Sequence, residues 1–132
     1  MYLVDSNIWL ERLLNQEKSK EVENFLDNVT SDQLFITDFA FHSIAVIMNR
    51  LKQMSGFLRF VQDTFIDGSV SLIHLTPEDT RYIVHIMEKY NMDFDDAYQY
   101  VTAEKYSLTI ISFDGDFDRT ELGRKPPLEF MS

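Results

Sequence analysis

The sequence contains no cysteine, which excludes disulfide bridges, thiolate zinc sites and a cysteine nucleophile. Basic residues are also scarce: 12 Lys and Arg stand against 22 Asp and Glu, a formal net charge of −10 over 132 residues. This charge disfavours binding of nucleic acid by the surface as a whole, because such binding needs Lys and Arg to neutralise phosphates. Any nucleic-acid site must therefore be a local one.

Long apolar runs are missing as well, and none approaches the roughly 18 residues that a membrane span requires. The first residues, Met1 to Asp5, lack the basic start and the long apolar stretch of a signal peptide. We therefore expect a cytoplasmic protein that does not associate with membranes. With four Gly, three Pro and no repeat or low-complexity segment, we expect a single domain over residues 1–132.

Short apolar segments alternate with helical patterns along the chain. The expected strands are 2–4, 34–36, 70–75, 108–111 and an edge strand at 128–130. Between them we expect helices, including a long buried helix over 39–51 that Ser55 and Gly56 end. This alternation predicts an α/β fold with a parallel sheet that helices cover on both faces.

Several acids follow or precede the expected strands at the edge where ligands bind in open parallel sheets. Asp5 follows the first strand directly, and Asp114 follows the strand over 108–111 after two residues. Asp95 and Asp96 open the helix before that strand. If these acids meet, they cannot all stay ionised without a counter-charge, so either their pKa values rise or a divalent cation binds. Oxygen ligands without Cys suit magnesium or manganese better than zinc.

Each acid also has a purely structural interpretation. Asp5 and Asp93 stand at expected helix starts, where an aspartate commonly caps the backbone. The segment Asp114-Gly115-Asp116 is typical of a plain turn. The residues by themselves favour a joint site only modestly, and they do not name a reaction.

Three short motifs of the chain resemble those of the PIN domain, the fold of VapC-like toxin ribonucleases. They follow the family's order over nearly the whole chain: Val4-Asp5-Ser6-Asn7, Asp95-Asp96-Ala97 and Ser112-x-Asp114-x-Asp116-Phe117. The resemblance implies a three-layer α/β/α sandwich with a mostly parallel sheet and a ribonuclease that depends on Mg²⁺ or Mn²⁺. It also implies that Asp5, Asp96 and Asp114 are catalytic and bind the metal, with Asp116 as an auxiliary catalytic acid and Ser112 as the hydroxyl of the last motif.

The same resemblance implies an RNA substrate and, if the chain is the toxin of a toxin–antitoxin pair, an antitoxin protein; we also expect a homodimer. One motif departs from the family. The family usually has a Glu in the helix after its second strand, and we expect that place to fall on His42. Asp38, four residues earlier on the same helical face, is a candidate substitute.

Two other functions remain open beside metal-dependent RNA hydrolysis. His42 in place of an acid favours a PIN-fold binding or regulatory module with a degenerate site and little or no nuclease activity. A phosphotransfer domain of the haloacid-dehalogenase or receiver type would use Asp5 as nucleophile or phosphoacceptor. That function is disfavoured, because Asn7 stands where the Asp-x-Asp motif needs its second acid.

Overall fold

Four parallel strands form the central sheet in the computed structural model, which describes residues 1–130. The strands are β1 (Tyr2–Val4), β2 (Leu34–Thr37), β3 (Ser71–Ile73) and β4 (Thr109–Ile111). Their order in the sheet is β3-β2-β1-β4, and Leu3 of β1 pairs with Phe35 on one side and Ile110 on the other. Since all strands are parallel, their carboxyl ends share one edge of the sheet.

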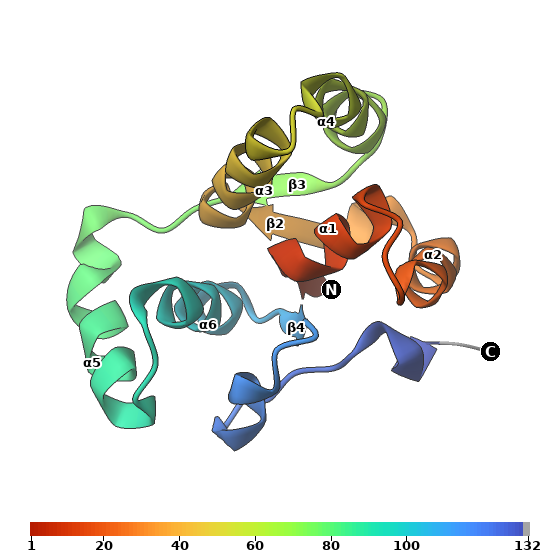
Figure 1. Cartoon of the computed structure of the whole chain (residues 1–132). Helices are drawn as coiled ribbons and strands as arrows, with labels where there is room; N and C mark the ends of the chain where they lie inside the picture. The colour runs from red at the N-terminus through yellow and green to blue at the C-terminus, as the bar shows by residue number, and fades with distance from the viewer. Residues whose placement is uncertain (131–132) are drawn as a thin grey trace.

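Within residues 1–130, six α-helices cover the two faces of this sheet: α1 (Ser6–Leu13), α2 (Ser19–Asn28), α3 (Asp38–Arg50), α4 (Met54–Val61), α5 (Thr80–Tyr90) and α6 (Phe94–Tyr106). Helices α1 to α4 lie on one face and α5 and α6 on the other (Figure 1). The two longest, α3 and α6, have 13 residues each. Among the described residues, no helix is long and apolar enough to cross a bilayer.

Alternation along the strands divides the apolar residues between two cores. Leu3 and Ile110 are buried with α5 and α6, whereas Val4 and Ile111 are buried with α1 to α4. Successive side chains of a strand point to opposite faces, so each short strand serves both cores. The predicted α/β fold is confirmed, with its parallel sheet between two helical layers.

Polar side chains at the strand ends start the helices that frame the site. The Asp5 carboxylate accepts from the backbone N–H of Ser6 at 2.7 Å and begins α1 directly after β1. The Thr37 hydroxyl at the end of β2 caps α3 in the same way, and Asp93 caps α6. These caps satisfy backbone donors that a helix start leaves free. They also direct three helix N-termini toward the carboxyl edge of the sheet.

One predicted helix boundary and one predicted strand are wrong. Ser55 and Gly56 lie inside α4, and the chain instead breaks just before it, where Lys52 adopts a φ of 57°. Burial of Phe57 and Phe60 in the core outweighs the low helix propensity of a glycine. The expected edge strand at 128–130 belongs to a 3-10 helix, Pro127–Phe130. Its proline lacks the N–H that a strand ladder uses.

Candidate functional site

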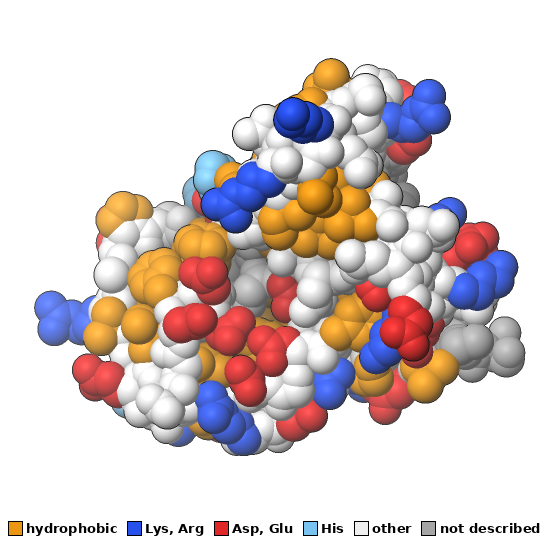
Figure 2. Space-filling model, viewed as in Figure 1, with side chains coloured by type: hydrophobic (Ala, Val, Ile, Leu, Met, Phe, Trp, Pro, Cys, Tyr) orange, Lys and Arg blue, Asp and Glu red, His pale blue; other side chains and the backbone are white. Residues whose placement is uncertain are grey.

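A polar cavity of about 170 Å³ lies at the carboxyl edge of the sheet, between the starts of α1, α3 and α6. Its wall consists of Asp5, Ser6, Asn7, Phe39, Ala40, Ser43, Asp95, Asp96, Gln99 and Asp114. Figure 2 shows Asp and Glu side chains gathered near the centre of one face of the molecule. The fold therefore brings the three acids predicted as metal ligands, Asp5, Asp96 and Asp114, to one cavity.

Three carboxylates lie close enough to share one ion. Asp96, Asp114 and Asp116 each place an oxygen within 4.8 Å of the others. This set offers oxygen ligands alone, which fits a hard divalent cation such as Mg²⁺ or Mn²⁺. Asp116, predicted as an auxiliary acid, thus belongs to the group, and Asp5 borders the same cavity outside it.

Hydrogen bonds hold the Asp5 carboxylate in a single orientation. One oxygen, Oδ1, accepts from the Ser6 N–H at 2.7 Å and from the Gln99 amide at 3.3 Å. The other, Oδ2, accepts from the Ser112 hydroxyl at 2.8 Å. Burial raises the pKa of Asp5, the bonds from Ser112 and Ser6 partly offset this, and the charge of Asp114 adds to the rise. These three bonds fix the carboxylate at the border of the cavity.

Ser112 ties the first motif of the chain to the last. Its fully buried hydroxyl donates to Asp5 and accepts from the backbone N–H of Asp114 at 2.9 Å. It also accepts from the Asn7 side-chain amide at 3.2 Å, while the Asn7 oxygen accepts from the N–H of Phe113. Ser112 thus links the Asp5 carboxylate to the backbone of Asp114, two acids that are 109 positions apart in the sequence.

The carboxyl of Asp96 is partly buried and is also surrounded by like charges. Burial raises the pKa of its carboxyl to about 7, and the neighbouring carboxylates of Asp93, Asp114, Asp5 and Asp116 contribute further. No Lys or Arg lines this cavity within the part of the chain that the structure describes. A bound cation would supply the missing counter-charge.

Gln99 is a site residue that the sequence analysis missed. Its side chain is 5% exposed, and it donates to Asp5 while its oxygen accepts from the Thr37 hydroxyl at 2.8 Å. The only local signal was its position three residues after Asp96, which places both on one face of α6.

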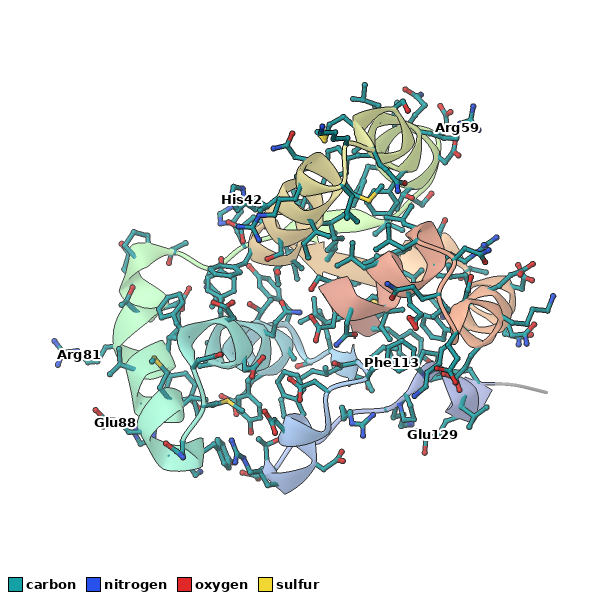
Figure 3. The ribbon with its side chains drawn as sticks, in the orientation of Figure 1. His42, Arg59, Arg81, Glu88, Phe113 and Glu129 are labelled. Atoms are coloured by element: carbon teal, nitrogen blue, oxygen red, sulfur yellow. The ribbon has the colours of Figure 1, made fainter. Side chains whose placement is uncertain are left out.

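The prediction that His42 stands in the place of a site acid is wrong. His42 is exposed, does not line the cavity, and projects from α3 as Figure 3 shows. Within the described residues, Ser43 is the polar side chain that α3 contributes to the cavity wall. Asp38 is no substitute, because it lies outside the wall and accepts a hydrogen bond from the Tyr98 hydroxyl at 2.8 Å.

Comparisons with known proteins agree with this architecture. A family model described as PIN domain matches residues 2–122 of the chain. No curated protein matches the sequence significantly.

Several solved structures share the fold at low sequence identity. VapC20 from Mycobacterium tuberculosis, described as a sarcin-ricin loop cleaving toxin, superposes with a TM-score of 0.78 at 13% identity, over 92% of this chain and 96% of that one. A toxin–antitoxin complex from Klebsiella pneumoniae superposes with a TM-score of 0.76 at 19% identity, over 96% of this chain and 98% of that one. FitAcB from Neisseria gonorrhoeae superposes with a TM-score of 0.74 at 18% identity, over 96% of this chain and 98% of that one. At these identities the likeness shows the fold alone.

Proposed function

The chain belongs to the PIN domain family, and from this premise we propose that it is an endoribonuclease that hydrolyses RNA phosphodiester bonds with Mg²⁺ or Mn²⁺. The observation that supports this most directly is the convergence of Asp96, Asp114 and Asp116 within 4.8 Å of one another. Asp5 adds a fourth acid to the same cavity. A structural neighbour described as a sarcin-ricin loop cleaving toxin is consistent with this activity.

The chain's own residues divide the work of such a site. Asp96, Asp114 and Asp116 would hold the cation. A bound divalent cation lowers the pKa of a water molecule and polarises a phosphate. Asp5, held by Ser112 and Gln99, keeps a carboxylate of fixed orientation beside that group. Asp96 retains a proton up to about neutral pH in the metal-free protein, so its carboxyl must lose this proton before it can act as a ligand.

We further propose that the chain is the toxin of a toxin–antitoxin pair, with an antitoxin protein as its partner. The support is that its structural neighbours include a toxin–antitoxin complex and a structure described as FitAB bound to a DNA fragment. A homodimer and a cytoplasmic location stay predictions.

A binding or regulatory module with little nuclease activity is the second candidate function. The observation that favours it is that α3, the helix in which the family usually has a Glu, contributes the Ser43 hydroxyl and no carboxylate to the described cavity wall. A site with three or four aspartates and without this glutamate places less negative charge near the cation than a site that has it. Cleavage assays separate the two functions, because a binding module keeps its fold and partner without cutting RNA.

The deciding experiment compares RNA cleavage by the intact protein and by Asp114→Asn in manganese. This variant is suitable because Asp114 Oδ1 accepts from the N–H of Asp116 at 2.9 Å, and an asparagine oxygen can do the same. We expect cleavage by the intact protein and its loss in Asp114→Asn. The control is Asp27→Asn, an exposed aspartate of α2, which should cleave normally. Equal cleavage by all three preparations would show a contaminating nuclease, and no cleavage by any would favour the binding module.

A further inference from the structure

Two aromatic side chains lie next to the acids of the cavity. Phe39, in the first turn of α3, forms part of the same wall as Asp96. Phe94 begins α6 two residues before Asp96, and its ring centroid is 6.2 Å from that of Phe39. Figure 2 shows hydrophobic side chains directly beside the red carboxylates on this face. The aromatic pair, Phe39 and Phe94, is therefore continuous with the proposed active site.

The aromatic pair rests on a ring that cannot move freely. Tyr98 lies 5.4 Å from Phe39 and 6.1 Å from Phe94, between ring centroids, and is only 8% exposed. Its hydroxyl donates to Asp38 at 2.8 Å and accepts from the N–H of Leu75 at 2.9 Å. Phe94 is nevertheless 38% exposed, which leaves part of its ring available to a ligand.

The charge of the protein limits how it can hold RNA. The net charge is −10, and the cavity wall has no Lys or Arg among the described residues. Arg124 is engaged with Asp118 and with the carbonyl of Ser112. Neutralising a phosphate at this wall would need Lys or Arg side chains in it. Stacking of bases on aromatic rings needs none, and it is effective for any unpaired base.

On the basis of the proposed nuclease function, we propose that Phe39 and Phe94 form a stacking platform for an unpaired RNA base next to the scissile phosphate. The substrate is then single-stranded at the cleavage point, because a paired base cannot reach a protein ring. Affinity comes chiefly from bases and only weakly from phosphates.

The test measures RNA binding separately from cleavage. All variants are made in the Asp114→Asn background, which should not cut, and the probe is a fluorescein-labelled single-stranded oligoribonucleotide of mixed sequence in manganese. We expect Phe94→Leu, which keeps apolar bulk but removes the ring, to weaken binding roughly 5- to 150-fold, the range for one stacked base. Phe94→Trp should bind at least as tightly as the parent. The control is Tyr106→Leu, because Tyr106 is 43% exposed on the same helix but about 18 Å away at its other end.

Two further probes distinguish bases from phosphates. An abasic oligomer of equal length has the same charge, and we expect it to bind at least about 5-fold more weakly, the lower end of the range for one lost stack. A duplex of the same sequence should also bind weakly. The logarithm of the binding constant falls with the logarithm of the salt concentration, with a slope of about −0.7 for each neutralised phosphate of a single strand. Because we expect few neutralised phosphates, the affinity for the single strand should fall only slightly with salt.

The possible failures are distinct. If the intact protein cleaves RNA but Phe94→Leu binds it as the parent does, the platform is refuted and the nuclease stands. Equal affinity for the abasic oligomer refutes the platform too. If Phe94→Leu leaves RNA binding unchanged but shifts the oligomeric state in sedimentation, the aromatic pair is a protein contact and the proposal is wrong. If the intact protein neither binds nor cleaves any RNA, the proposed function itself fails.

Discussion

Replacing Asp96 by asparagine should stabilise the protein without metal and remove its stabilisation by metal. The pKa of this carboxyl is about 7 in the folded protein, against about 4 in an unfolded chain. Between these two pH values the folded state binds the extra proton, so the free energy of unfolding falls as the pH rises from about 4 to about 7. Above pH 7 the full cost of an ionised Asp96 is present.

The size of this cost follows from the difference in pKa. About three units at about 1.4 kcal/mol each set an upper limit near 4 kcal/mol. Asp96 is partly exposed, and solvent screening reduces this to about 1–2 kcal/mol. Asn removes the charge at nearly constant volume. At pH 8 in chelator we therefore expect Asp96→Asn to melt about 3–8 °C above the intact protein, and at pH 4 we expect no difference.

Manganese should reverse this order. At a concentration 100 times its dissociation constant, a ligand of the folded state adds about 2.7 kcal/mol to the stability of the intact protein. Asp96→Asn lacks one of the three carboxylates of the group and should gain much less. Thermal melts at pH 4 and at pH 8, each with chelator and with manganese, give the melting temperature of both proteins under four conditions. Asp27→Asn serves as the surface control. A lower melting temperature for Asp96→Asn at pH 8 in chelator would refute the reasoning, as would an equal metal shift in both proteins.

Three further predictions concern single residues. Gln99→Leu should lower the free energy of unfolding in urea by about 1–3 kcal/mol, because the buried Thr37 hydroxyl loses its acceptor; an unchanged midpoint would show that water replaces the amide. Ser43→Glu should tighten manganese binding in calorimetry, whereas His42→Glu, one residue away and exposed, should not; equal effects would place neither at the site. Ser107→Gly should stabilise the protein by about 0.5–1 kcal/mol, because Ser107 ends α6 with a φ of 57°, and a lower melting temperature would contradict this.

Local patterns in the sequence predicted the elements that depend on neighbouring residues. The strand at Tyr2–Val4, the cap at Asp93 and the position of Asp5 at a strand end all follow from the few residues around them. Parallel pairing then brings the carboxyl ends of β1 and β4 together, so the meeting of Asp5 with Asp114 was within reach of sequence reasoning.

Other features depend on how the elements pack, and no local pattern contains them. Whether His42 or Ser43 faces the cavity depends on the rotation of α3, where one residue turns the side chain by about 100°. Gln99 reaches Asp5 across 94 positions of sequence, and only the docking of α6 on the sheet brings the two together.

The sequence by itself determined the α/β fold, the caps at Asp5 and Asp93 and which acids stand at the strand ends, because capping and strand alternation act over a few residues. The tertiary structure decided that Asp116 joins the three-carboxylate group, that Ser43 faces the cavity and that Asp96 holds a proton to about pH 7. These depend on distances and burial between segments far apart in the chain, which only the packed fold defines.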